Sequence, residues 1–237
     1  MVDIHCHILP GIDDGSATWE VTTQMCRMAA LDGITHIVAT PHCDGHYEYD
    51  RAHFTDMLAT LSEVSGGHIT FSIGCDFHLS GRNVEAAMED PRPFALGDTQ
   101  YIMVEFDHHG IPSNADDLLR AILSRGMVPI ITHPERNAYL IKNLDVVQQF
   151  IKMGCLSQVT ANAFTGFWGP KSKKAAEKLL QKNSIHIVAT DAHDLNLRPP
   201  VLSEARKRIV ELAGPATADA LVDHNPSAVV AGQSIAT

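Results

Sequence analysis

The sequence predicts an α/β fold in which parallel strands, each followed by a helix, close into a barrel. Short apolar runs alternate with helical stretches seven times along the 237 residues, which is the pattern of consecutive β–α units. The apolar runs are rich in β-branched residues and are often apolar on both faces, as buried parallel strands are. Seven such units in one chain favour a closed barrel over an open sheet.

The predicted strands share one composition. Valine, isoleucine and threonine are frequent in them, and these side chains fit a pleated, buried sheet. In chain order the predicted strands are residues 2–4, THIVAT at 35–40, HITFSIG at 68–74, YIMVEF at 101–106, MVPIIT at 127–132, LSQVT at 156–160 and IHIVAT at 185–190.

Each predicted strand is followed by a stretch with helical periodicity. Glycine follows three of these stretches, at Gly33, Gly126 and Gly154, where a left-handed residue commonly ends a helix. In chain order the predicted helices are residues 18–31, 50–64, 82–89, 115–124, 144–153 and 171–181, with 202–212 and 216–222 after the last strand. No linker or repeat divides the chain, so residues 1–237 are expected to form a single domain.

Composition limits the classes of function. Hydrophobic residues make up 45% of the chain and can supply a sizeable core, and the net charge of −10 argues against nucleic acid or an anionic membrane as a partner. An anionic substrate is still compatible, because a metal ion can reverse the local field. No apolar run approaches the ~18 residues of a transmembrane helix, and no signal peptide is visible. Five cysteines without paired spacing indicate free thiols and a cytoplasmic location.

Polar side chains stand at the C-terminal end of every predicted strand. In chain order they are His5 and His7, His42, Asp76, Glu105, His133 with Glu135 and Arg136, Asn162, and Asp191 with His193. In a barrel these ends meet at one mouth, where such folds place their chemistry. Most of these residues are metal-ligand types with nitrogen or oxygen donors, and the HxH and DxH spacings put both side chains on one face. The sequence therefore predicts a metal site.

Each of these residues also has a purely structural interpretation. An isolated histidine is more often a hydrogen-bonded core residue or a surface residue than a ligand. That interpretation is preferred for His36, His53, His68, His186 and His224. Standing alone, Asp13 and Asp14 in GIDDGS can serve only as turn formers. Ligand-type residues at six of seven strand ends are difficult to explain in this way, so a metal site is the better interpretation.

Other catalytic schemes fit the sequence less well. Cysteine-dependent phosphatases need an arginine six residues after the cysteine, and none of the five cysteines has one. The chain contains neither a GxSxG nucleophile motif nor a GxxxxGKS or GxxxxGKT phosphate-binding loop. No cysteine is therefore expected to act as a nucleophile.

The combined motifs resemble the polymerase and histidinol phosphatase (PHP) superfamily. They are DIHCHILPGIDDG, ATPH, VEF, THPERN, QVTANAFTGFWG and ATDAHDLNLRPP, and they run from residue 3 to residue 200, with NP at 225–226 fitting as well. HILPGIDDG and HDLNLRPP resemble most closely the bacterial PHP-type protein tyrosine phosphatases that are encoded with capsule and exopolysaccharide genes.

The resemblance implies a distorted (β/α)7 barrel of the TIM type, the PHP fold, with the active site at the C-terminal ends of the strands. It also implies two or three divalent metal ions of manganese, iron or zinc, with manganese favoured. The first metal would take His5, His7, Asp76 and Asp191; the second would take Asp76 as a bridge with Glu105 and His133; the third would take Asp14, His42 and His193.

Five further positions carry expectations. Asp3 is expected to orient an imidazole ligand, and Asp13 to form a turn. Asp76 departs from the family, which usually has glutamate there, so that bridging two ions would require a closer backbone or a water molecule. His108 and His109 either line the substrate groove or lie in an exposed loop, and the exposed loop is slightly preferred.

The resemblance implies hydrolysis of phosphotyrosine on a protein by metal-bound hydroxide. The substrate would be a bacterial tyrosine kinase that regulates capsule or exopolysaccharide synthesis. Divalent ions neutralise the phosphate dianion and lower the pKa of a bound water. Arg136 and Arg198 match family positions near the site, and a guanidinium group suits paired contacts with phosphate oxygens. Asp14 and His42, at the third metal, are candidates for protonating the leaving oxygen.

Three alternatives remain open. A PHP phosphatase of a small molecule such as histidinol phosphate would share the metals, but Asp14 in place of histidine, and RPP after DAH, favour the tyrosine phosphatase. A nuclease-like PHP domain is disfavoured by the charge of −10. An inactive metal-binding barrel is left open by Asp76 alone.

Overall fold

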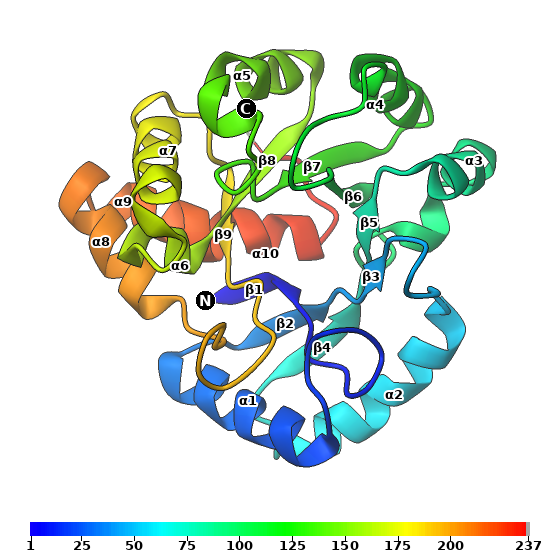
Figure 1. The fold of residues 1–237 in the computed structure, drawn as a ribbon. Helices are drawn as coiled ribbons and strands as arrows, with labels where there is room; N and C mark the ends of the chain where they lie inside the picture. Colours follow the sequence, from blue (N-terminus) through cyan, green and yellow to red (C-terminus); the bar gives the residue numbers. More distant parts are fainter. Residues whose placement is uncertain (236–237) are drawn as a thin grey trace.

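The chain folds as alternating strands and helices, and all the paired strands are parallel (Figure 1). The computed structural model describes residues 1–235, apart from the side chains of residues 81–82. The strands are β1 (Val2–Cys6), β2 (His36–Ala39), β3 (His42–Cys43), β4 (Thr70–Ile73), β5 (Asp76–His78), β6 (Tyr101–Glu105), β7 (Val128–Thr132), β8 (Leu156–Thr160) and β9 (Ile187–Ala189).

Most of the helices surround the strands in Figure 1, whereas α10 lies across the centre of the view. The helices are α1 (Trp19–Asp32), α2 (Arg51–Val64), α3 (Gly81–Glu89), α4 (Ala115–Ser124), α5 (Leu144–Met153), α6 (Ala161–Thr165), α7 (Gly169–Gln181), α8 (Ser203–Ala213), α9 (Pro215–Asp219) and α10 (Asn225–Val230). Short 3₁₀ turns form η1 (Arg92–Phe94) and η2 (Leu140–Lys142), and a π-helical turn forms η3 (Ala220–His224). None of the helices in residues 1–235 has both the length and the apolarity that crossing a bilayer requires.

Two of the predicted strands are interrupted and then resume. The sheets have the orders β1-β2-β4 and β3-β5-β6-β7-β8-β9, so the chain changes sheet between β2 and β3 and again between β4 and β5. Pro41 lies in the first interruption and has no N–H to offer the ladder. Gly74 lies in the second, where a Cβ would stand 2.4 Å from Leu96. These breaks carry His42 and Asp76 to the first positions of β3 and β5, whereas the sequence placed both residues after a strand end.

The ends of the strand series lie side by side. An isolated parallel bridge joins Cys6 to Ala192, and His7 N–H donates to the Ala192 carbonyl at 2.8 Å. Figure 1 accordingly draws β1 and β9 next to each other in the centre of the molecule. The last residues of β1 and the segment after β9 are therefore held together by backbone contacts.

Two hydrophobic clusters fill the molecule. The larger one packs the helices against the outer faces of the strands. The smaller one contains inward-facing residues of six strands, together with Leu96 from the loop before β6 and Val229 of α10. The strand residues are Val2, Ile4, Val38, Tyr101, Met103, Ile130, Leu156, Ile187 and Ala189. Because side chains alternate along a strand, Glu105 follows Met103 on the same face of β6. An apolar layer thus lies directly beneath a polar one.

The sequence located most elements and missed the short ones. Helices α4 and α5 have the predicted bounds, and Gly154 ends α5 in the left-handed conformation with a φ of 111°. The last predicted helix, 216–222, is instead α9 followed by the π turn and α10. Helix α6 and the 3₁₀ turns were not predicted, because three to five residues are too few to display a helical period.

One buried histidine outside the polar layer makes stability depend on pH. His186 is 5% exposed, and its Nδ1 accepts a hydrogen bond from Ser157 N–H at 3.1 Å. Burial lowers the pKa of His186 to about 4, whereas an unfolded chain keeps it near ~6.5. Between pH ~6.5 and pH 4 the unfolded chain carries a proton on His186 that the folded protein does not. The contribution of neutral His186 to the free energy of unfolding is therefore complete above pH ~6.5 and is lost as the pH falls toward 4.

We expect His186→Asn to remove this dependence of stability on pH, because the amide oxygen of asparagine can accept the hydrogen bond from Ser157 N–H and does not titrate. The difference in unfolding free energy between the two proteins should change by about 3 kcal/mol between pH 7 and pH 4. Urea unfolding of both proteins across this range is the measurement. Parallel pH profiles would show that His186 does not titrate as described.

Candidate metal centre

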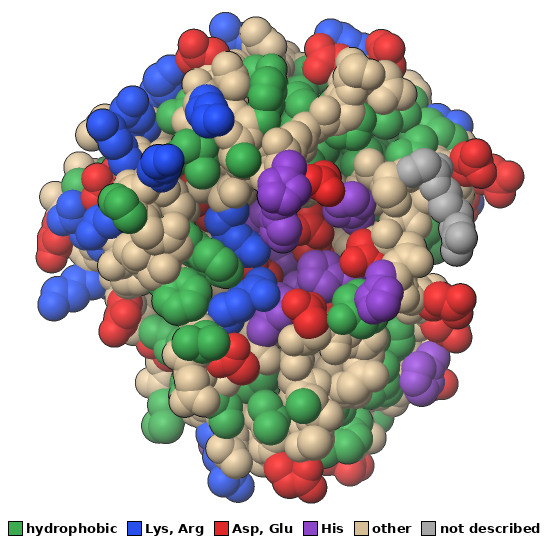
Figure 2. Space-filling model, viewed as in Figure 1, with side chains coloured by type: hydrophobic (Ala, Val, Ile, Leu, Met, Phe, Trp, Pro, Cys, Tyr) green, Lys and Arg blue, Asp and Glu red, His purple; other side chains and the backbone are tan. Residues whose placement is uncertain are grey.

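Histidine and carboxylate side chains gather in a hollow at the C-terminal ends of the strands. Figure 2 shows the histidines together in the central hollow with acidic groups among them. Strands supply His5, His42, Asp76 and Glu105, and the residues that follow strands or lie in loops supply His7, Asp14, His133, Asp191 and His193. The Asp14 side chain is 51% exposed and that of His42 15%, while the other seven residues are buried. The structure therefore brings together all nine predicted ligands.

His5 lies at the deepest point of this group. Its Nε2 atom is 3.2 Å from His7 Nε2, 3.3 Å from Asp76 Oδ2 and 3.2 Å from Asp191 Oδ1. One imidazole nitrogen and two carboxylate oxygens thus lie within 3.3 Å of His5 Nε2, and the exposed fraction of each carboxylate side chain is 1% or less. This is the set predicted for the first metal.

Asp14 joins two histidines at the mouth of the hollow. Its Oδ1 atom lies 3.4 Å from His42 Nε2 and 3.3 Å from His193 Nε2. The His7 ring lies beside both of these histidines, with ring centroids 4.3 and 3.9 Å away. The residues predicted for the third metal are therefore close together, and His7 stands between them and His5.

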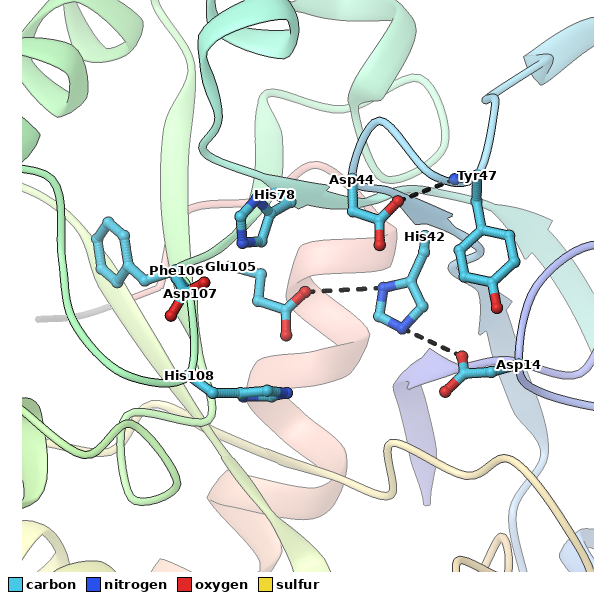
Figure 3. A pocket seen from close by; sticks show the side chains of 9 residues that line it. All are labelled: Asp14, His42, Asp44, Tyr47, His78, Glu105, Phe106, Asp107 and His108. Carbon is cyan, nitrogen blue, oxygen red and sulfur yellow. Dashed lines mark hydrogen bonds and ion pairs between the residues drawn. The ribbon is translucent and has the colours of Figure 1, made fainter.

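Asp76 lies between the residues around His5 and the histidines that contact Asp14. Its Oδ2 atom is 3.3 Å from His5 Nε2 and 3.4 Å from His42 Nδ1. Glu105 continues the chain of contacts, with Oε2 3.7 Å from His42 Nδ1 and Oε1 3.3 Å from His133 Nε2. Figure 3 shows His42 between Glu105 and Asp14. Despite its short side chain, Asp76 occupies a position from which it can serve two neighbouring ions.

The donor set fits divalent cations. Four groups of donor atoms lie within 4.8 Å of one another: His7, Asp14, His42 and His193; His5, His7 and Asp76; His5, His133 and Asp191; and His42, Asp76 and Glu105. Several buried atoms in these groups have no hydrogen-bond partner among the described residues, including both oxygens of Asp76, His42 Nδ1 and His193 Nε2. A buried carboxylate without hydrogen bonds is costly unless positive charge beside it compensates, as a bound cation would. Two groupings differ from the prediction. His133 lies in a group with His5 and Asp191, and His42 takes the place predicted for His133 beside Asp76 and Glu105.

The electrostatics of the hollow favour positive charge. Burial lowers the pKa of His5, but the charges of Asp191 and Asp76 raise it more, to about 9. Burial likewise lowers the pKa of His42, while a hydrogen bond with Asp14 and the charges of Asp76 and Glu105 raise it to about 10. Only a strongly negative local potential reverses the effect of burial on an imidazole in this way.

Backbone strain is concentrated at two of the candidate ligands. Three residues other than glycine have a positive φ among those described: His133 at 31°, Asp191 at 53° and Asn183 at 50°. This region is disfavoured for residues with a Cβ and is retained where the surroundings impose it. Asp191 is held by its N–H, which donates to the His5 carbonyl at 2.8 Å. Two ligand side chains are thus aimed inward by strained backbone.

The groups that orient the imidazoles differ from those expected. Asp3 does not contact an imidazole; it accepts hydrogen bonds from Thr190 and from the His5 backbone N–H, so that expectation was wrong. Gln158 Oε1 instead contacts His5 Nδ1 at 3.0 Å. Asp13 forms the predicted turn by accepting Gly15 N–H at 2.9 Å, but its Oδ2 also contacts His7 Nδ1 at 2.7 Å. Such contacts fix the ring orientation of a metal-binding histidine.

Arg136 and Arg198 lie at one side of the hollow. Both guanidinium groups contact Asp191 Oδ2, Arg198 at 2.6 Å. The Arg136 guanidinium carbon lies 4.0 Å from the centre of the Trp168 ring, and that of Arg198 lies 5.6 Å from it. Two fixed positive charges therefore stand beside the carboxylate cluster, where an anionic group can reach them.

A cavity of about 360 Å³ opens over this centre. Its lining combines predicted residues with five that the sequence analysis did not select: Asp44, Tyr47, His78, Phe106 and Asp107. His78 follows Asp76 by two positions, so strand alternation could have indicated it. His108 and His109 are both exposed residues of a loop, as preferred, and His108 also lines the cavity.

Other polar residues named from the sequence lie outside the centre. Glu135 is completely buried and accepts Thr160 N–H at 2.9 Å, and Asn162 Oδ1 accepts the Trp168 indole N–H. His36 contacts the hydroxyl groups of Thr70 and Ser72. His53, His68 and His224 are exposed, which agrees with the structural interpretation that the sequence favoured for them.

All five cysteines are free and buried, and none lines the cavity. We therefore expect iodoacetamide, applied to the folded protein, to leave turnover of an aryl phosphate unchanged. Treatment in urea, which should modify all five thiols, is the control that the reagent is active. Loss of turnover while the metal content stays constant would contradict a mechanism without a thiol nucleophile.

Comparison with known proteins identifies relatives over most of the chain. A family model described as capsular polysaccharide synthesis, CpsB/CapC, matches residues 1–231. The tyrosine-protein phosphatase YwqE of Bacillus subtilis is 33% identical over 84% of this chain and 79% of its own length. The tyrosine-protein phosphatase CpsB of Streptococcus pneumoniae is 28% identical over 99% of this chain and 100% of its own.

A solved structure is similar over the whole chain. It comes from a study of YwqE from Bacillus subtilis and CpsB from Streptococcus pneumoniae, which describes them as unique metal-dependent tyrosine phosphatases. The TM-score is 0.91 at 29% sequence identity, covering 100% of this chain and 96% of the other. The similarity therefore includes every element that forms the hollow.

Proposed function

The chain belongs to the capsular polysaccharide synthesis family CpsB/CapC, and we propose that it is a metal-dependent phosphatase that hydrolyses phosphotyrosine on a protein. The observation that carries the proposal is the convergence of nine histidine and carboxylate side chains beneath one open cavity. The relatives' names as tyrosine phosphatases support the substrate class. The phosphoprotein is proposed to be a bacterial tyrosine kinase of capsule or exopolysaccharide synthesis.

We propose that the centre holds two or three divalent ions, with manganese favoured over iron and zinc. Nitrogen and carboxylate donors without a thiolate suit these metals. The first ion would be held by His5, His7, Asp76 and Asp191; the second by Asp76, Glu105 and His133; the third by Asp14, His42 and His193. Contacts of His5 with His7, Asp76 and Asp191, of Glu105 with His133, and of Asp14 with His42 and His193 support these sets. Bound there, the ions would supply positive charge for the phosphate and an activated water for the attack.

The protein's own side chains have three tasks in this mechanism. Arg136 and Arg198 bind the phosphoryl oxygens and fix the phosphate beside Asp191, because two guanidinium groups can make paired hydrogen bonds to an oxyanion. Trp168 stacks on both and restricts their orientation. Asp14 and His42 face the cavity. When the centre holds two ions and the third set is free, the His42 imidazolium, paired with Asp14, is proposed to donate its proton to the departing tyrosine oxygen.

We further propose that the strands form a distorted, closed (β/α)7 barrel and that residues 1–237 are one domain. The bridge between Cys6 and Ala192 supports closure, as does the inner apolar cluster to which six strands contribute. The family match over residues 1–231 supports a single unit. A cytoplasmic location is proposed from the five free cysteines, which a reducing compartment would preserve.

A substrate panel tests the function. The protein is first treated with chelator and then assayed with and without Mn²⁺ on a phosphotyrosine peptide, histidinol phosphate and single-stranded DNA. We expect Mn²⁺-dependent release of phosphate from the peptide, and much slower reaction with the other two. Preference for histidinol phosphate or cleavage of DNA would identify one of the rival PHP activities, and no turnover with bound metal would indicate an inactive barrel.

A further inference from the structure

Three adjoining cavities form a path from the metal centre to helix α7. The second cavity has a volume of about 370 Å³ and is lined by His108, Arg136, Ile141, Trp168, Lys171 and Ser172. The third, of about 480 Å³, is lined by residues 141–146 together with Lys178, Gln181 and Lys182. His108 lines both the first and the second cavity, and Ile141 both the second and the third. We call the second and third cavities together the lysine groove.

The groove is basic although the protein is acidic. The net charge is −10, yet seven of the eight lysines lie between residues 142 and 182. Among residues 1–235, Lys182 is the one lysine in an ion pair, with Asp145 at 2.6 Å. Figure 2 shows basic side chains gathered on the side of the hollow where Figure 1 places α7. A local basic strip of this kind offsets the repulsion that an acidic ligand would meet elsewhere on the surface.

The second cavity has the features of an anion site. Helix α7 begins there, and its N-cap residue, Trp168, makes no side-chain capping hydrogen bond. Ser172, in the first turn, is 3% exposed, and its Oγ has no hydrogen-bond partner among the described residues. The start of a helix presents the positive end of the helix dipole to an anion. Gly169 N–H already donates to the Gly166 carbonyl at 2.9 Å and Pro170 has no N–H, so the dipole and the Ser172 hydroxyl, not a row of free N–H groups, are what α7 offers. Lys171 is exposed beside it, and Arg136 completes the lining.

We propose that the lysine groove binds acidic side chains that flank the phosphotyrosine in the substrate protein, an inference that rests on the phosphatase activity proposed above. The phosphotyrosine occupies the first cavity, and a neighbouring carboxylate reaches the second at Lys171 and Ser172. Lys171 and Lys178 lie about 10 Å apart along α7, at ~1.5 Å per residue. An extended peptide covers that distance in about three residues, so several acidic side chains can be bound in succession.

The test compares two phosphotyrosine peptides that differ only by glutamate or glutamine at the positions on both sides of the tyrosine. With the Mn²⁺-loaded protein we expect kcat/KM to be about fivefold higher for the glutamate peptide, mainly through KM, since each exposed ion pair adds little. This preference should decrease as salt is added, because the charges are exposed to solvent.

The double variant Lys171→Gln/Lys178→Gln should hydrolyse both peptides at the rate of the glutamine peptide. Lys207→Gln is the matched control, because Lys207 is an exposed lysine of α8 outside the groove. The Lys207→Gln protein should keep the preference for the glutamate peptide. An aryl phosphate without a peptide should react equally with all three proteins. Equal rates for the two peptides with the parent protein, or a preference that persists in the double variant, would overturn the groove. Absence of any phosphotyrosine turnover would instead overturn the proposed function.

Discussion

Asp76→Asn is expected to lower kcat/KM for a phosphotyrosine peptide by on the order of 10²–10³-fold, the usual cost of removing one preorganised electrostatic group. Asp76 lies 3.3 Å from His5 and 3.4 Å from His42, between the deep and the outer donor groups. The asparagine keeps the shape of the side chain but removes the negative charge that two neighbouring cations would share. Steady-state kinetics and metal titration of the two proteins measure the effect.

Two companion variants make this result specific. Asp76→Glu should retain activity and bind metal at least as tightly, because its extra methylene extends the reach of the bridging carboxylate. Asp56→Asn, on an exposed position of α2, controls for the chemical change alone. If Asp76→Asn retains the parent's metal affinity and turnover, Asp76 does not bridge, and other residues must bring two ions together.

His133→Asn is expected to remove one metal ion and to lower activity by on the order of 10²-fold or more. His133 is buried, reaches Glu105 at 3.3 Å, and belongs to the donor group with His5 and Asp191. Its φ of 31° makes asparagine the suitable replacement, because asparagine tolerates this backbone region better than most residues. The fold should therefore survive while the imidazole is lost.

The control for His133→Asn is the same substitution at His53, an exposed residue of α2. His53→Asn should have the parent's metal content, activity and unfolding curve. Elemental analysis and circular dichroism of both variants separate loss of a ligand from loss of the fold. A His133→Asn protein that keeps its metal and half or more of its activity would remove His133 from the centre.

Much of the fold follows from periodicity, and the exceptions have physical causes. The buried parallel strands are apolar on both faces, so each is visible as a short run such as YIMVEF or IHIVAT. Strands β3 and β5 were missed because they have two and three residues and follow breaks at Pro41 and Gly74. The need for Gly74 arises from Leu96, a neighbour that only the folded chain brings close.

The candidate ligands were predictable because strand ends in this architecture meet at one mouth. The residues that contact and orient these ligands were harder to predict, because the partner of a side chain depends on loop geometry. Asp3 and Asp13 illustrate this: the first contacts the backbone near Thr190, and the second contacts an imidazole. Tyr47 and Asp44 reach the cavity from an irregular loop that carries no periodic signal. Arg136 and Arg198 were predicted near the site, and both contact Asp191.

The most direct test of the central claim is to follow phosphatase activity as metal is returned to metal-free protein. Bound ions per chain are determined by elemental analysis, and phosphate release from a phosphotyrosine peptide is measured on the same samples. We expect no turnover without metal, and a rise that reaches its maximum at two or three bound Mn²⁺ ions per chain. Full turnover in samples that hold less than one ion per chain would contradict metal-dependent hydrolysis.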